Sequence, residues 1–217
     1  MDDYLSESEQ WEWLKAKVRE NIIWVLLGIA LAAAGIYGWR WWQGQQESTS
    51  VDASVKYDAI LTAFDKGDRT KALTLIGELG REHPDSPYHD QALLAEARIY
   101  VQNGQLDKAA ENLRNVMGRT KDEPLALAAR LRLARVQLAQ NKPDDARATL
   151  DAQKDPGAFK GRYHEARGDI LLAKGDKAGA LTEYKAAVDG ADRGTVDGEL
   201  LELKIKDLSD GAPKAEK

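Results

Sequence analysis

The chain has 217 residues, with 31 Lys and Arg against 36 Asp and Glu, a formal net charge of −5, and no cysteine. This weakly acidic balance does not favour nucleic acid as a partner, and the lack of cysteine excludes disulfides and thiolate-ligated metals. Proline is scarce, while Ala, Leu and the charged residues typical of helices abound, so the composition favours an all-α fold.

The first predicted element is a transmembrane helix over residues 21–42, preceded by an acidic tail over residues 1–20. Residues 21–39 carry no charge, and 19 residues rising about 1.5 Å each can cross a hydrocarbon layer about 30 Å thick. A cleavable signal peptide is the alternative, since Ala32 and Ala34 form an A-x-A pattern. The acidic tail is unlike a short basic leader, and Trp and Tyr mark both edges of the span, so we expect an uncleaved anchor.

Two features of the span predict its orientation and its contacts. Lys15, Lys17 and Arg19 precede it closely, whereas Arg40 alone follows, so the tail should be cytoplasmic and the rest of the chain should lie across the membrane, in the periplasm of a bacterium. Three small residues at helical spacing could admit a second transmembrane helix, although such helices are generally rich in Gly and Ala. These residues are Gly28, Ala32 and Gly35.

Residues 43–52 form a polar segment that is either a linker or the end of a continuing helix, and one domain is expected over residues 53–208. Within it, four segments align on a turn residue followed five positions later by Ala, at spacings of 37, 37 and 34 residues. The pairs are Gly67 and Ala72, Gly104 and Ala109, Asn141 and Ala146, and Gly175 and Ala180. Each unit is predicted to be a helix, a tight turn and a second helix, because Gly or Asn at the turn tolerates the left-handed conformation.

The apolar residues of these units indicate that the hairpins stack. A large apolar or aromatic residue follows each Ala by four positions, and Ile60, Ala97, Ala134 or Gly168 precedes each turn residue by seven. One hairpin cannot bury its own apolar stripe, so the units should form an α-solenoid. A helix over about 196–208 would cap the last hairpin, and residues 209–217 should be a disordered tail.

The fourth unit resembles a tetratricopeptide (TPR) repeat, and the first unit adds Pro84. The matching residues are Gly168, Leu171, Gly175, Ala180, Tyr184 and Ala187. A generic array of α-hairpins is the alternative. The expected fold is therefore all-α: one N-terminal transmembrane helix, a TPR-like solenoid of about four hairpins and a C-terminal capping helix.

The combination of acidic tail, single span and four-unit domain resembles the YfgM family of ancillary SecYEG translocon subunits. The resemblance is carried by Tyr4 with Glu7, Glu9 and Gln10, and by residues 38–42 (GWRWW), 131–137 (LRLARVQ), 171–177 (LLAKGDK) and 204–209 (KIKDLS). It spans nearly the whole chain, departing beyond Ser209 and in the greater number of Trp residues near the N-terminus.

This resemblance implies an inner-membrane protein with a periplasmic domain that associates with the SecYEG translocon and the periplasmic chaperone PpiD. The implied role is to help newly secreted chains pass to periplasmic chaperones, and no catalytic residues carry over. Two alternatives stay open: an oligomeric envelope scaffold, and a regulatory protein whose cytoplasmic tail binds a soluble stress regulator.

The residues themselves indicate no cofactor, metal or small-molecule substrate. No P-loop, GxSxG or HExxH motif occurs, and His83 and His89 lack the spacing of a helical ligand pair, so both are expected to be solvated loop residues. Enzymatic activity is therefore not expected.

Partner binding is expected on the concave face of the solenoid, which the first helix of each hairpin lines. The phase of the pattern predicts Tyr57, Leu61, Phe64, Leu94, Arg98, Val101, Leu131, Arg135 and Leu138 on that face. Arg98 and Arg135 stand at equivalent positions, so two guanidinium groups could hold a carboxylate or backbone carbonyls. Alternatively they are solvated, or paired with acids such as Glu96 or Asp144.

Overall fold

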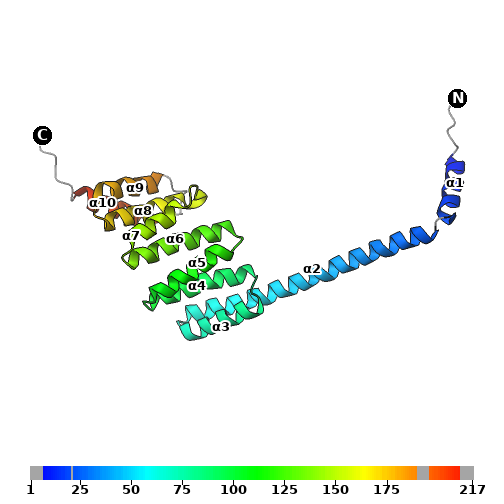
Figure 1. Cartoon of the computed structure of the whole chain (residues 1–217), viewed down its shortest axis with the longest axis horizontal. Coiled ribbons are helices and arrows are strands. Elements are labelled where there is room, and N and C mark those ends of the chain that lie inside the picture. The colour runs from blue at the N-terminus through cyan, green and yellow to red at the C-terminus, as the bar shows by residue number, and fades with distance from the viewer. Residues whose placement is uncertain (1–6, 21, 190–195, 211–217) are drawn as a thin grey trace, which may run out of the picture. The chain divides into compact units, whose positions relative to one another are not determined.

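The computed structural model describes residues 7–20, 22–189 and 196–210, and these residues form helices and the turns between them (Figure 1). The helices are α1 (Glu7–Glu20), α2 (Ile22–Asp65), α3 (Arg69–Glu82), α4 (Pro87–Gln102), α5 (Leu106–Arg119), α6 (Glu123–Ala139), α7 (Pro143–Asp151), α8 (Lys160–Ala173), α9 (Lys177–Asp189) and α10 (Gly198–Asp210). A 3-10 turn, η1 (Gly157–Phe159), precedes α8. The chain divides into two compact units, Met1–Asp52 and Ala53–Lys217.

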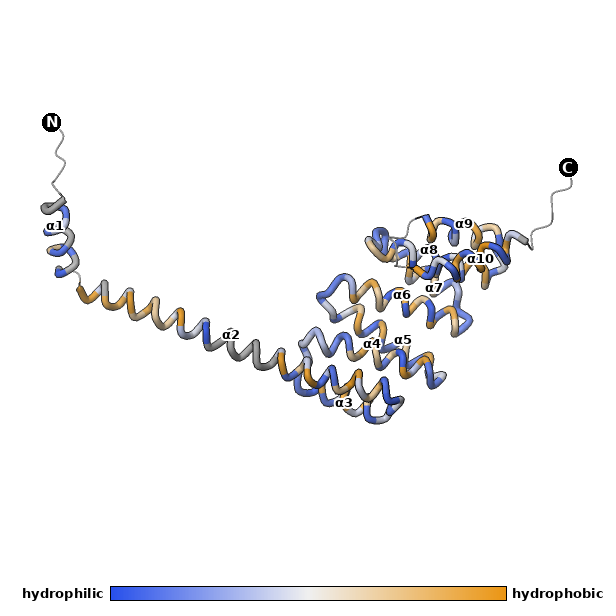
Figure 2. Tube along the Cα trace, turned by 180° about the vertical axis from the view of Figure 1, so that it is seen from behind, coloured by the Kyte–Doolittle hydropathy of each residue, from blue (hydrophilic) through white to orange (hydrophobic). Residues whose placement is uncertain are grey.

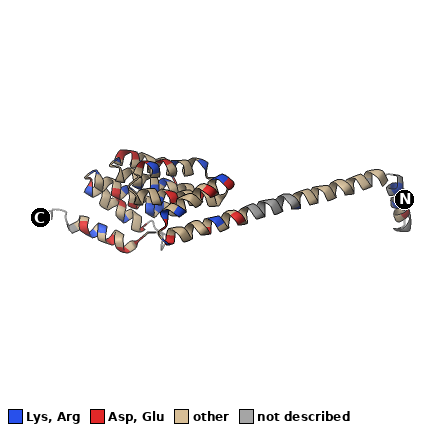
Figure 3. Cartoon of the chain, turned by 90° about the horizontal axis from the view of Figure 1, so that it is seen from below, with Lys and Arg blue, Asp and Glu red and all other residues tan. Residues whose placement is uncertain are grey.

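The N-terminal unit holds α1 and the apolar first part of α2. Residues Ile22–Arg40 have a mean hydropathy of 2.0 (Figure 2). None of this segment is buried within the protein. Figure 3 shows that most of the segment lacks charged side chains. Among the described residues this is the one helix long and apolar enough to cross a membrane, as the sequence predicted.

Helix α2 continues without interruption for 44 residues, from Ile22 to Asp65. Residues 43–52 are therefore helical, the second of the two alternatives that their sequence allowed. The second unit begins inside this helix at Ala53, so the last turns of α2 serve as the first helix of the first hairpin.

The second unit is a stack of four helical hairpins closed by one further helix (Figure 1). The hairpins pair α4 with α5, α6 with α7, and α8 with α9, and α10 packs against α9. The end of α2 pairs with α3 in the first hairpin, where Ala63 and Ala72 share one apolar cluster. This arrangement confirms the predicted TPR-like solenoid and its capping helix.

The four predicted turn residues share one backbone conformation. Gly67, Gly104, Asn141 and Gly175 have φ of 73°, 72°, 61° and 85°, the left-handed region that favours glycine. In every turn the next residue donates its backbone N–H to the carbonyl five positions back, as Asp68 does to Ala63. This bond pattern ends the first helix of each hairpin and satisfies carbonyls that would otherwise lack partners.

The predicted small and large residues meet in the core. Ala72, Ala109, Ala146 and Ala180 are all fully buried where two helices approach closely. The large residues one turn later are also buried, and they are Ile76, Leu113, Leu150 and Tyr184. Removing such surface from water is the main stabilisation of stacked hairpins, at roughly 25 cal/mol per Å².

Candidate functional site

Two adjoining cavities lie over the first helices of the first three hairpins. One, of about 330 Å³, is lined by Tyr57, Leu61, Phe64, Gln91, Leu94, Ala95, Arg98, Leu125 and Arg132. The other, of about 430 Å³, is lined by Ala97, Arg98, Val101, Leu106, Leu113, Arg132, Arg135, Val136 and Ala139. Because Arg98 and Arg132 line both cavities, the two cavities meet at these side chains, and together they are here called the arginine groove.

Seven of the nine residues predicted for the binding face line this groove. Tyr57, Leu61, Phe64, Leu94 and Arg98 line the first cavity, and Arg98, Val101 and Arg135 line the second. Whether they bind a partner stays a prediction.

The other two predicted residues, Leu131 and Leu138, lie elsewhere. Leu131 is 3% exposed and packs with Tyr163 and Ile170 in the core shared by the third and fourth hairpins, and Leu138 packs against the same cluster. Helix α6 stands between two neighbouring hairpins, so part of its apolar surface faces the next hairpin instead of the groove.

Arg132 belongs to the groove and was missed from the sequence. It stands three residues before Arg135 on α6, and residues three apart share a helix face. The signal was therefore present in the LRLARVQ stretch, but the repeat comparison matched Arg135 with Arg98 and gave Arg132 no counterpart.

The groove concentrates positive charge. Partial desolvation lowers the pKa of the Arg132 guanidinium from its ordinary value although the residue as a whole is exposed, and the charges of Arg98, Arg162 and Arg135 lower it further. Arg98 lies over the ring of Phe64, with 4.6 Å from its guanidinium carbon to the ring centroid. Neither Arg98 nor Arg132 forms an ion pair with an acidic residue in the part of the chain that the structure describes.

The alternative that these arginines pair with acids holds for Arg135, but the acids named for it, Glu96 and Asp144, have other partners. Glu96 accepts hydrogen bonds from Tyr100 and Asn112, and Asp144 pairs with Lys174 at 2.6 Å. Arg135 pairs instead with Glu165 of α8, at 3.2 Å. Glu165 also accepts from Lys204 of α10, at 3.1 Å, so this acid is already shared between two cations.

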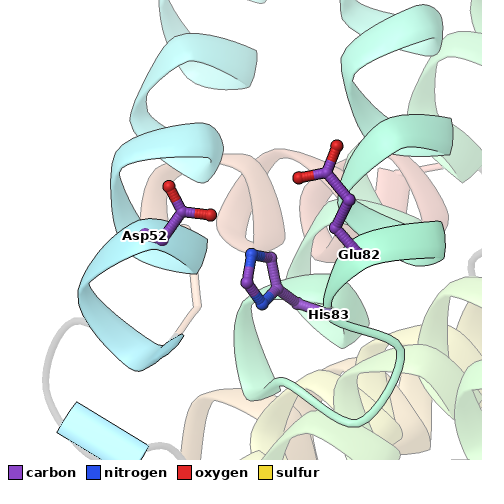
Figure 4. Close-up of side chains that lie close together, drawn as sticks. All are labelled: Asp52, Glu82 and His83. Carbon is purple, nitrogen blue, oxygen red and sulfur yellow. The ribbon is translucent and has the colours of Figure 1, made fainter. Parts of the chain in front are cut away.

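The histidines depart partly from expectation. His89 is not a loop residue: it lies in the first turn of α4, is 8% exposed, and its Nδ1 lies 3.0 Å from the carbonyl oxygen of Pro84. The ring fits there because Gly80 leaves room, since a Cβ at that glycine would lie 2.7 Å from Nε2. His83 follows Glu82 at the end of α3 (Figure 4), and Asp52, also drawn there, belongs to the N-terminal unit.

Gly28, Ala32 and Gly35 lie on the exposed apolar part of α2. An added Cβ at either glycine would meet no atom within 4 Å, so this side of the helix has no partner within the described chain. Its association with a second transmembrane helix stays a prediction.

Comparison with known proteins adds relatives of nearly full length. Residues 15–210 match the family model described as a tetratricopeptide repeat-like domain. A protein of Escherichia coli (strain K12) named ancillary SecYEG translocon subunit is 32% identical over 209 residues, covering 96% of this chain and all of the relative. A protein of the same name from Haemophilus influenzae is 27% identical over 204 residues, covering 94% and 98%.

Solved structures show the same fold at lower identity. BtubC (BKLC) from P. vanneervenii matches with a TM-score of 0.57 and 15% identity, over 76% of this chain and 83% of that chain. The MamA RS-1 ArsTM double mutant matches with a TM-score of 0.53 and 14% identity, over 73% and 94%. Repeat domain, single apolar helix and full-length relatives agree, and this chain belongs to the TPR-like family of ancillary SecYEG translocon subunits.

Proposed function

We propose that this protein is a non-enzymatic adaptor, anchored in the bacterial inner membrane beside the SecYEG translocon. The name of its full-length relatives supports the association with the translocon. The arginine groove carries the adaptor role, because it is an open, partly apolar depression on the face that TPR-like arrays use to hold extended segments.

In this proposal the tail before α2 is cytoplasmic and the repeat domain is periplasmic. Lys15, Lys17 and Arg19 before the span, against Arg40 after it, support that orientation. The chain has no native cysteine, so single cysteines report topology cleanly. Asn115→Cys should react with an impermeant thiol reagent in intact spheroplasts, whereas Glu12→Cys should react only after lysis, and the reverse pattern would invert the topology.

The groove would receive a segment of a partner on the route from the translocon to the chaperone PpiD, either a newly secreted chain or PpiD itself. Photo-crosslinking amino acids in place of Leu61 and Val101, which are 40% and 42% exposed in the groove, test this directly. We expect crosslinks to translocon subunits, PpiD or secreted chains from both positions. The matched control is Lys185 on the exposed side of α9, and equal crosslinking from it would remove the groove from the binding site.

Native gel electrophoresis of the detergent-extracted protein separates this adaptor from the two alternatives. Co-migration with translocon subunits supports the adaptor, whereas a homo-oligomer without them supports a scaffold. Loss of the main partner on deletion of residues 1–14 would point to the regulatory tail.

A further inference from the structure

We infer that the arginine groove recognises an internal acidic side chain that is flanked on both sides by apolar residues of an extended partner segment. The inference rests on the proposed function, since it specifies the chemistry of the segment that the groove would hold. Three features of the groove lead to it: two arginines without an acidic partner, apolar walls on both sides of them, and contacts that hold Arg98 and Arg135.

The first feature is that Arg98 and Arg132 have no acidic partner among the described residues. Arg98, Arg132, Arg135 and Arg162 converge from α4, α6 and α8, and the repulsion among them contributes to the lowered pKa of Arg132. The nearby acid Glu165 is already shared by Arg135 and Lys204, and it leaves Arg98 and Arg132 without a carboxylate. A carboxylate from outside the chain would relieve this repulsion and accept charge-assisted hydrogen bonds from both guanidinium groups.

The second feature is the position of the charge between apolar walls. On one side the wall consists of Tyr57, Leu61, Phe64 and Leu94, and on the other it includes Val101 and Leu113. A segment whose acid reaches Arg98 and Arg132 therefore has apolar surface to bury in both directions. A chain terminus would fill only one side, and an anion such as a phosphate would fill neither, so the geometry selects an internal Asp or Glu.

The third feature is that Arg98 and Arg135 already have partners within the chain before any ligand arrives. The ring of Phe64 supports the Arg98 guanidinium at 4.6 Å, and the salt bridge to Glu165 holds Arg135 at the rim. Side chains that are already ordered lose less conformational entropy on binding. In such a site the apolar walls accept many sequences, and the arginines add specificity for a segment that carries an acid.

The test uses the full chain in lipid nanodiscs and two fluorescent peptides of about 13 residues with blocked ends. Both carry apolar residues on each side of a central position, which is Glu in one peptide and Gln in the other. Fluorescence anisotropy should show that the Glu peptide binds about tenfold more tightly, a preference that falls as salt concentration rises. The double variant Arg98→Gln with Arg132→Gln should abolish the preference, while Arg114→Gln on the exposed face of α5 should leave it unchanged.

Equal binding of the two peptides would overturn the inference, and so would binding of neither. In both cases crosslinks from Leu61 and Val101 would still test the proposed function, because they report any occupant of the groove. If those crosslinks were also absent, the proposed function would fail together with the inference. A third peptide with a free C-terminal carboxylate and no acidic side chain checks the alternative source of the charge, and tighter binding of that peptide would refute an internal acid.

Discussion

The middle and the C-terminal end of the repeat domain use one repeat position in opposite ways. Leu61, Arg98, Arg135 and Asp169 each stand six residues before the left-handed turn residue of their hairpin. In the second and third hairpins this position carries a cation that lines the arginine groove. In the fourth it carries an acid, and the Nζ of Lys204 from the capping helix lies 2.7 Å from its Oδ1.

The polar groups at the capped end are satisfied from within the chain. Asp169 also accepts a hydrogen bond from the hydroxyl of the fully buried Tyr184, at 2.8 Å, and His164 contacts Glu183 at 2.7 Å. Burial, followed by the bond to Asp169, raises the pKa of Tyr184. In the groove, by contrast, Arg132 meets mainly other arginines. Charges at the capped end are therefore paired within the chain, whereas Arg98 and Arg132 of the groove have no acidic partner among the described residues.

The largest effect should come from breaking the capped end at Gly168. A Cβ there would lie 2.4 Å from Cε1 of Tyr184, so Gly168→Ala must displace a ring that is fully buried. We expect a loss of about 2–3 kcal/mol in the free energy of unfolding. Circular dichroism with thermal or urea unfolding measures it.

Gly77→Ala on α3 is the matched control for that substitution. An added Cβ at Gly77 meets no atom within 4 Å, and alanine is the better helix former, so this variant should gain about 0.5–1 kcal/mol. Equal effects at the two glycines would show that the contact between α8 and Tyr184 does not constrain the fourth hairpin.

A smaller loss should follow removal of the cation that joins the cap to the fourth hairpin. Lys204 bonds both Glu165 and Asp169, so Lys204→Met should cost about 1–2 kcal/mol in the free energy of unfolding at pH 8. Lys185→Met, on the exposed face of α9, is the control and should change stability by less than about 0.5 kcal/mol.

The pH dependence of the Lys204 effect has a definite sign. Burial alone would lower the pKa of Lys204, but the hydrogen bonds and charges of Asp169 and Glu165 outweigh it and raise the pKa above the ordinary 10.5. A raised folded-state pKa gives stabilisation that is complete below the unfolded pKa and disappears as pH rises through the folded one. The difference between wild type and Lys204→Met should therefore be constant between about pH 7 and pH 10, where Asp169 and Glu165 are ionised, and shrink above that range. A difference that grew with pH would contradict this ion pair.

The repeat architecture could be predicted from sequence because its signals are local. Gly67 and Asn141 mark turns by their own backbone preferences, and Ala72 marks a close helix contact by its size. The ion pairs that distinguish the groove from the capped end join distant parts of the chain. Arg135 and Glu165 are 30 residues apart in sequence, and Lys204 and Asp169 are 35 apart. Periodicity places such residues on a helix face but does not say which neighbour reaches them.

The same limit explains the errors at the candidate site. Leu131 has the period of a groove residue, yet it packs into the neighbouring hairpin because α6 has hairpins on both sides. Arg132 shares a helix face with Arg135, but its place among other arginines depends on α4 and α8. His89 is buried because a glycine on another helix makes room for it.

The smallest effect on stability should come from a substitution in the groove, and it tests whether a groove arginine contributes to the fold as Lys204 does. If Arg132 served the fold as Lys204 does, then Arg132→Gln would destabilise the protein. The charges of Arg98, Arg162 and Arg135 instead oppose that of its guanidinium, so removing its charge should relieve repulsion. We expect the free energy of unfolding to rise by no more than about 0.5 kcal/mol, and to rise more at low salt, where repulsion is less screened.

Urea unfolding of wild type and variant at 20 mM and 500 mM NaCl measures this change and its salt dependence, with Arg114→Gln as the control. A loss near that of Lys204→Met would assign Arg132 to the fold and leave the groove without a charge reserved for a partner.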